Sequence, residues 1–210
     1  MKKMEIDIPL TSVTLKGELA IPENAIGMVI FSHGSGSSRL SPRNRSVADL
    51  IQQYGMGTLL FDLLTEKEDS VYQNRFNIDL LASRLIETTE WLMQHKEAKG
   101  LPIGYFGAST GAASALRAAA YFEQGIQAVV SRGGRPDLAF NILHQVTAPT
   151  LLIVGQLDVP VIKMNKEAFD ELKTEKEMKI IPGATHLFEE PEKLMEAAEL
   201  AISWYKKYLK

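Results

Sequence analysis

The stretch of sequence that decides the fold is Ile103-Gly104-Tyr105-Phe106-Gly107-Ala108-Ser109-Thr110-Gly111. Its first residues form a short apolar run typical of a buried strand, and the alanine-rich segment 110–122 is typical of a helix. Gly107 to Gly111 has the form G-x-S-x-G at the junction. A serine on such a sharp turn has a strained backbone, and small neighbours let the chain pass closely. The stretch predicts that Ser109 is a nucleophile; the alternative is that Ser109 only caps the helix.

Apolar runs and helical stripes alternate on both sides of this stretch. We expect strands at residues 4–9, 12–21, 28–31, 58–61, 103–106, 126–130, 150–154 and 179–181. We expect helices at residues 42–54, 76–97, 110–122, 136–145, 160–173 and 191–208, and a long polar loop at 65–77 that could flank the site. The order predicts an α/β fold in a single domain, residues 1–210, with a mostly parallel sheet between layers of helices. Such sheets bind ligands at the carboxyl ends of their strands.

A serine hydroxyl needs a base that takes its proton. The sequence has four histidines. His186 stands between the last expected strand and the last expected helix, so its loop leaves the same edge of the sheet as Ser109. His95 and His144 lie on expected helices and fit the role less well. We therefore predict that His186 is the base; its alternative is a surface loop position.

The third group should be a carboxylate that orients the histidine and stabilises its charged form. Asp158 follows the strand expected at 150–154, again at a carboxyl end. A turn or helix-cap aspartate is the alternative, because Pro160 follows closely. Asp137 is a rival acid that reads more naturally as the start of a helix. The order Ser109, Asp158, His186 is that of the α/β-hydrolase fold.

Catalysis at an acyl carbon also needs donors aimed at the developing oxyanion. We predict the backbone N–H groups of Thr110, the residue after the nucleophile, and of Ser35, in the glycine-containing loop after the strand at 28–31. In the same loop, His33 and Gly34 are possible substrate contacts, and His33 more plausibly braces the loop by hydrogen bonds. A phosphate-binding glycine loop is disfavoured because no G-K-[ST] follows.

Arginines gather near the same edge. Arg132 and Arg135 follow the strand expected at 126–130, and Arg39, Arg43 and Arg45 follow the oxyanion loop. Arginine can bind a substrate carboxylate or phosphate through two parallel hydrogen bonds. Arg132 and Arg135 are therefore possible substrate-binding residues. The alternative, which we favour, is that they are solvated or paired with acidic residues.

Composition excludes several classes. Hydrophobic residues make up 45% and charged residues 23%, and the formal net charge is -3. The sequence shows no basic face, so neither nucleic acid nor an acidic membrane is expected as a partner. The absence of cysteine excludes disulfides and thiolate metal sites, and the histidines lack metal-ligand spacing. No apolar run could span a bilayer or act as a signal-peptide core, so a cytoplasmic protein is expected.

With these motifs in place, the chain resembles the α/β-hydrolase superfamily, and within it the compact dienelactone-hydrolase-like branch. The resemblance runs from the His33-Gly34 loop to residues 182–188. It implies an eight-stranded sheet whose second strand is antiparallel, hydrolysis through an acyl-enzyme, and no cofactor. One departure matters: dienelactone hydrolases use a cysteine nucleophile, and position 109 is serine, which favours a general carboxylesterase over dienelactone.

We therefore predict a serine hydrolase that cleaves carboxylic ester or lactone bonds of small substrates with the triad Ser109, His186 and Asp158. Few residues separate the strands expected at 126–130 and 150–154, where larger relatives insert a lid, so we expect an open site without a large lid. Acyl transfer or peptide cleavage by the same triad stays open, as does a non-catalytic binding domain with this fold. The sequence leaves monomer and homodimer open.

Overall fold

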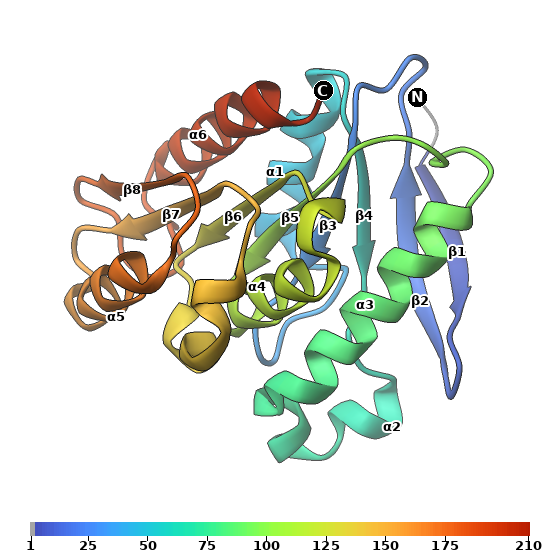
Figure 1. The fold of residues 1–210 in the computed structure, drawn as a ribbon, viewed down its shortest axis with the longest axis horizontal. Coiled ribbons are helices and arrows are strands. Elements are labelled where there is room, and N and C mark those ends of the chain that lie inside the picture. The colour runs from blue at the N-terminus through green and yellow to red at the C-terminus, as the bar shows by residue number, and fades with distance from the viewer. Residues whose placement is uncertain (1–2) are drawn as a thin grey trace.

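One eight-stranded sheet organises the chain in a computed structural model that describes residues 3–210 (Figure 1). The strands lie side by side in the order β1-β2-β4-β3-β5-β6-β7-β8. Their bounds are β1 Lys3–Pro9, β2 Thr14–Ala20, β3 Met28–Ser32, β4 Gly57–Phe61, β5 Ile103–Ala108, β6 Ala128–Arg132, β7 Thr150–Gly155 and β8 Lys176–Ile181. β2 runs antiparallel to β1 and β4, and the pairs from β4 through β8 are parallel. The predicted fold class is confirmed.

Helices cover both faces of the sheet, as Figure 1 shows. Their bounds are α1 Pro42–Gln53, α2 Glu66–Asp69, α3 Ile78–Gln94, α4 Thr110–Phe122, α5 Val159–Glu171 and α6 Lys193–Tyr208. α1 and α6 bury their apolar sides on one face, where Val47 and Ile202 join a core with Phe31 and Phe106 of the strands. α3, α4 and α5 cover the other face, where Leu85 and Leu116 pack near Tyr105. Alternate residues of the buried strands thus pack into two different cores, because successive side chains point to opposite faces of the sheet.

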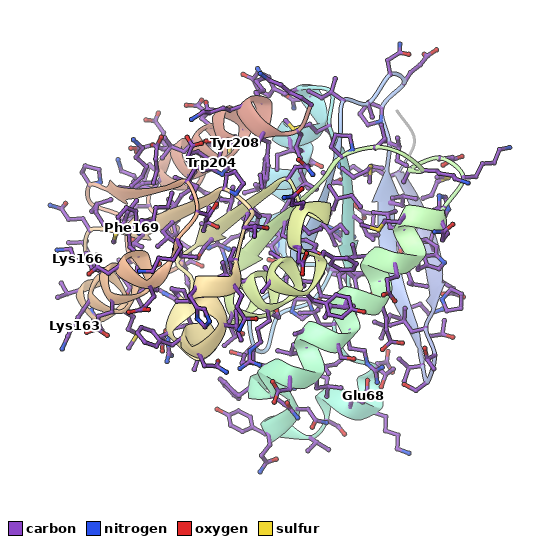
Figure 2. All side chains as sticks on the ribbon, viewed as in Figure 1. Glu68, Lys163, Lys166, Phe169, Trp204 and Tyr208 are labelled. Atoms are coloured by element: carbon purple, nitrogen blue, oxygen red, sulfur yellow. The ribbon has the colours of Figure 1, made fainter. Side chains whose placement is uncertain are left out.

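The helix α6 is tied to the sheet by two polar contacts inside largely apolar packing. Trp204 of α6, labelled with Tyr208 in Figure 2, donates its indole N–H to the carbonyl of Pro149 at 3.2 Å. Tyr205 donates its hydroxyl to the carbonyl of Tyr105 at 2.7 Å. Buried aromatic side chains usually find such partners for their polar ends. These bonds fix α6 against β5 and the start of β7.

The segment 65–77, expected to be a loop, contains α2 and the 3₁₀ helix η1, Tyr72–Phe76. Thr65 and Glu68 form a reciprocal capping box, which satisfies N–H groups at the start of α2. Glu68, labelled in Figure 2, also pairs with Arg84 of α3 at 2.7 Å. The loop prediction was wrong here, because the capping pattern Thr-x-x-Glu at 65–68 starts a short helix within this polar stretch.

Two further differences concern the ends of β6 and the type of the helix that follows it. β6 begins at Ala128, two residues later than expected, and continues to Arg132 because its register with β5 extends to Ala108. The expected helix 136–145 is the 3₁₀ helix η3, Pro136–Gln145, with a kink at Ala139. η3 is the one helical element between β6 and β7, which agrees with the absence of a large lid there. Within residues 3–210, no helix combines the length and the apolar character needed to cross a bilayer.

Gly111 tests how tightly the nucleophile turn packs. A Cβ at this position would lie 2.0 Å from the carbonyl oxygen of Ser32 and 2.6 Å from that of His33. Both are backbone atoms, so a clash cannot be relieved by turning a side chain. We expect Gly111→Ala to lower the free energy of unfolding by about 3 kcal/mol or more, measured by urea denaturation.

Gly125→Ala is the matched control, because the nearest atom to its added Cβ is Phe122 Cβ at 3.3 Å, a mild overlap that a small local shift relieves. It should cost less than about 1 kcal/mol. Equal denaturation midpoints for the two variants would contradict the tight approach of β3 to the start of α4.

Candidate active site

Ser109 lies at the turn between β5 and α4 with φ 51° and ψ −123°, a backbone conformation that residues with a side chain rarely adopt. Its N–H donates to the carbonyl of Arg132, and its own carbonyl accepts the N–H of Arg135. The position is the N-cap of α4, yet within the described chain the Ser109 hydroxyl makes no capping bond. The Ser109 side chain therefore does not act as a helix cap. Its hydroxyl is left beside the positive end of the helix dipole.

Asp158 and His186 form a short polar contact. Asp158 Oδ2 lies 2.6 Å from Nδ1 of His186. The Asp158 side chain is 12% exposed and that of His186 is 38% exposed. A largely desolvated carboxylate forms a strong hydrogen bond with an imidazole N–H, and the bond directs the other ring nitrogen outward. Although Asp158 occupies the cap position before α5, its side chain does not cap that helix.

The loops that carry these two residues are held together by their backbones. Leu157 donates its N–H to the carbonyl of Ala184 at 2.9 Å. Gly155 comes so close to the second loop that a Cβ there would lie 2.4 Å from the Ala184 carbonyl oxygen. Thr185 is braced in turn by Glu190, which accepts its N–H at 3.1 Å. The hydrogen bonds from Thr185 lower the pKa of the Glu190 carboxyl.

The histidine loop meets the nucleophile turn at Gly133. Arg132, whose carbonyl holds the Ser109 N–H, directly precedes it. A Cβ on Gly133 would lie 3.7 Å from Cε1 of His186. The structure thus gathers the three predicted residues at one edge of the sheet. Among residues 3–210, no hydrogen bond joins Ser109 Oγ to His186, a contact that in many hydrolases closes only around substrate.

The loop after β3 lies against the nucleophile. A Cβ on Gly34 would be 3.0 Å from Cβ of Ser109 and 3.7 Å from its hydroxyl oxygen. The Ser35 N–H, predicted to face the oxyanion, donates to Oγ1 of Thr110 at 2.8 Å. The Thr110 N–H belongs to the first turn of α4, where backbone donors have no partner inside the helix. The two predicted donors are therefore neighbours, and that of Ser35 is already engaged by a side chain.

His33 braces this loop as expected. Its Nε2 accepts the N–H of Leu63 at 3.1 Å, and its Nδ1 lies 2.9 Å from the carbonyl of Gly34. Nε2 is therefore unprotonated and Nδ1 donates. Both ring nitrogens are used by backbone groups, which leaves neither for the substrate contact that the sequence also allowed. Burial is the main cause that lowers the pKa of His33 below its usual 6.5.

The rival carboxylate Asp137, and Asp62 directly after β4, are engaged elsewhere. Asp137 binds Arg135 through two parallel hydrogen bonds, both 2.8 Å long. Asp62 accepts from the guanidinium of Arg39 at 2.7 Å. Asp158 is thus the strand-end carboxylate that contacts His186, and Arg135 takes the paired role that we favoured for it.

A hollow of about 740 Å³ lies on the β2 side of the oxyanion loop. His33, Ser37, Arg39, Asp62 and Leu64 are among its lining residues. Residues 65–67 and Asp69 also line the hollow, so the segment 65–77 lies beside the oxyanion loop, although Ser109, Asp158 and His186 are not among the lining residues. In the described part of the chain, no cluster of three or more His, Asp or Glu side chains could hold a metal ion.

Three residues near the site were not predicted from the sequence. Asn44 and Phe188 contact the guanidinium of Arg132, and Glu189 pairs with Arg43 at 2.6 Å. Phe188 ends the histidine loop segment 182–188 and Glu189 directly follows it, which was a signal of their proximity. Asn44 gave no signal, because its contact depends on where the start of α1 lies relative to the end of β6.

Comparisons with known proteins identify the family and the fold. The sequence profile of the dienelactone hydrolase family matches residues 16–210. Two putative phosphoribosyl transferases of Mycobacterium tuberculosis strains are 50% identical over 205 residues, which is 98% of this chain and 46% of each relative. The chain therefore spans less than half of those relatives.

Solved structures extend the comparison. A dienelactone hydrolase from Anabaena variabilis has a TM-score of 0.97 and 52% identity, covering 100% of this chain and 99% of that one. An esterase from Pyrococcus furiosus has a TM-score of 0.82 and 19% identity, covering 100% and 92%. The second likeness concerns the fold alone.

The buried, neutral His33 predicts a pH dependence of stability. Below about pH 6.5 the unfolded chain takes a proton on this residue, whereas the folded chain resists it because the pKa is lowered. Stability should therefore fall as the pH drops below 6.5. We expect His33→Gln to remove up to about 1.4 kcal/mol per pH unit of that fall, measured by urea denaturation from pH 7 to 5.

His144→Gln is the control, because His144 is exposed on η3. It should leave the slope of unfolding free energy against pH close to that of the unmodified chain. A His33→Gln slope equal to that of His144→Gln would show that His33 is not held neutral.

Proposed function

The chain belongs to the dienelactone hydrolase family, which supports a hydrolase activity, and we propose that it cleaves carboxylic ester or lactone bonds of small substrates through a Ser109 acyl-enzyme. The observation that carries the proposal is the Asp158–His186 bond of 2.6 Å beside a serine on a strained strand-to-helix turn. That combination supplies a nucleophile, a base and an orienting acid at one edge of the sheet. The serine at position 109, in place of the cysteine of dienelactone hydrolases, favours a general carboxylesterase over an enzyme that acts on dienelactone.

The proposed reaction begins at the Ser109 hydroxyl. Because Asp158 holds the Nδ1–H of His186, Nε2 is the free acceptor that takes the serine proton. Ser109 Oγ bonds to the substrate carbonyl carbon, and the carbonyl oxygen becomes the oxyanion. His186 then gives the proton to the leaving alkoxide. Water repeats the sequence on the acyl-enzyme, with His186 as base, and releases the acid.

The oxyanion is stabilised in this proposal by the start of α4. The Thr110 N–H is the first donor, and the helix dipole adds to it. Ser35 supplies the second donor once the oxyanion displaces the Thr110 hydroxyl from its N–H, a bond now 2.8 Å long. Removal of one such donor typically lowers the rate by about 10²–10³-fold.

Other outcomes differ in what enters the site. Acyl transfer needs an acceptor alcohol or amine in place of water, and peptide cleavage needs an amide. The phosphoribosyl transferase name belongs to proteins of which this chain covers 46%. No residue pair described above favours transfer of a sugar phosphate over acyl chemistry, so hydrolysis stands as the proposal.

We expect Ser109→Ala to abolish labelling by a fluorophosphonate probe and to lower kcat/KM for p-nitrophenyl acetate by about 10³-fold or more. Asp158→Asn should lower it by about 10³–10⁴-fold, because the histidine loses its orienting acid. Asp137→Asn is the matched control, since that carboxylate is bound to Arg135. Labelling and steady-state hydrolysis are the measurements.

Retention of activity in Ser109→Ala would remove the proposed nucleophile. A loss with Asp137→Asn as large as that with Asp158→Asn would reassign the acid. Absence of any labelling of the unmodified chain would favour the binding-domain alternative.

The short connection between β6 and β7 gives a second prediction. With η3 alone in that connection, little chain is present there to cover a long acyl group. We expect kcat/KM for p-nitrophenyl esters to be highest between acetate and butyrate and to fall by about tenfold or more toward palmitate, for lack of apolar cover. A preference for the longest chain would contradict an open site for small acyl groups.

A further inference from the structure

Arg132 differs from every other arginine of the chain. Eight arginines occur in the sequence, and seven of them have a carboxylate partner within 4 Å. Within residues 3–210, Arg132 has none, although it is the most buried of them at 5% exposure. A buried charge without a counter-ion is costly, and proteins normally pair it. Its retention here calls for a role that the fold alone does not supply.

The surroundings of the Arg132 guanidinium offer it few hydrogen-bond acceptors. One Nη donates to Oδ1 of Asn44 at 3.3 Å, and Cζ stands 5.6 Å from the ring centre of Phe188. Its Nε is buried and has no hydrogen-bond partner in the described residues. Arg43 adds a second positive charge nearby. Burial first, and then Arg43, lowers the pKa of Arg132 to about 10, so it stays charged at neutral pH.

This cluster adjoins the catalytic edge. Arg132 ends β6, and its carbonyl holds the Ser109 N–H. Phe188 lies two residues after His186. Arg43 and Asn44 lie in the first turn of α1, where the helix dipole also favours negative charge and which carries no acidic residue. The positive groups thus come from α1 and β6 and meet beside the histidine loop.

We propose that Arg132 and Arg43, with Asn44, form a subsite for an oxyanionic group, a carboxylate or a phosphate, of the substrate cleaved at Ser109. The inference rests on the proposed function and extends it to the class of substrate. Guanidinium groups bind both anions by paired charge-assisted hydrogen bonds. Arg135, bound to Asp137, is not part of the subsite.

Glu189 now partly occupies the place of that anion. Its carboxylate binds Arg43 at 2.6 Å from a side chain that is 59% exposed. Exposed ion pairs contribute little to stability and exchange readily. An incoming oxyanion would replace Glu189 on Arg43 and at the same time approach the unpaired Arg132. Glu189 would then act as a weak competitor for its own subsite.

A structural role for Arg132 is the competing explanation. Its cation–π contact with Phe188 could position the histidine loop. That role would affect charged and neutral substrates alike, whereas an anion subsite acts on charged substrates alone. The ratio of the two activities separates the explanations.

The first experiment compares mono-p-nitrophenyl succinate with its neutral methyl ester. We expect Arg132→Gln to lower the ratio of kcat/KM for the charged ester to that for the neutral ester by about 10–100-fold, the loss of a charge-assisted hydrogen bond. Glu189→Gln should raise the ratio about two- to fivefold by removing the competitor. Arg117→Gln, a surface arginine paired with Asp79, is the control and should leave the ratio within twofold.

The second experiment needs no catalysis. In the Ser109→Ala chain, calorimetry should detect binding of inorganic phosphate or of succinate, weakened at least tenfold by Arg132→Gln and strengthened by Glu189→Gln. Preference for phosphate or for succinate identifies which anion the subsite takes. If Arg132→Gln fails to fold, the Glu189→Gln result decides both experiments.

Several results would overturn the subsite. They are a ratio that stays within twofold in both Arg132→Gln and Glu189→Gln, equal losses on both esters, or the binding of neither anion to Ser109→Ala. Failure of the proposed function is distinguished because it would appear as ester hydrolysis that survives Ser109→Ala, whatever the anion binding.

Discussion

The turn between β5 and α4 is the constraint on which the rest of the site depends. Ser109 can hold a positive φ only because backbone on three sides fixes it: β6 accepts its N–H, residue 135 donates to its carbonyl, and β3 packs against Gly111. Strain of this kind costs about 1–3 kcal/mol and persists where the surroundings over-determine it. The same contacts leave the hydroxyl without a capping bond and place it beside the loop that follows β3.

Close backbone approach also explains how distant segments meet. Gly155 and Gly133 allow the loops after β7 and β6 to touch the histidine loop with no side chain between them. The Asp158–His186 bond is short because both ends stand on docked backbone. The oxyanion loop is held differently, because both ring nitrogens of His33 form hydrogen bonds with neighbouring backbone groups. A neutral imidazole is thereby used as a fixed strut, whereas the His186 side chain is left 38% exposed.

The sequence was sufficient for the parts that depend on local pattern and order. The turn at Ser109, the strand-end positions of Asp158 and His186, and the bracing role of His33 follow from motif and chain order. Boundaries were less accurate, since β6 ends where its register with β5 ends, which no single strand specifies. The helix α2 was missed although Thr65 and Glu68 carried its capping pattern. The bond from the Ser35 N–H to the Thr110 hydroxyl could not be predicted, because it depends on one side-chain rotamer.

The arginines show most clearly where sequence reasoning stops. Arg132 and Arg135 stand three residues apart and looked equivalent in the sequence, yet alternation along β6 sends Arg132 to the α1 face, while Arg135 lies beyond the strand beside Asp137. One charge is therefore neutralised and the other is buried without a carboxylate. Removing Arg132 in favour of an apolar side chain would relieve that cost, since buried ion sites are often less stable than apolar packing. A destabilising charge kept beside a nucleophile is more simply explained by an anion that it binds than by the fold that it burdens.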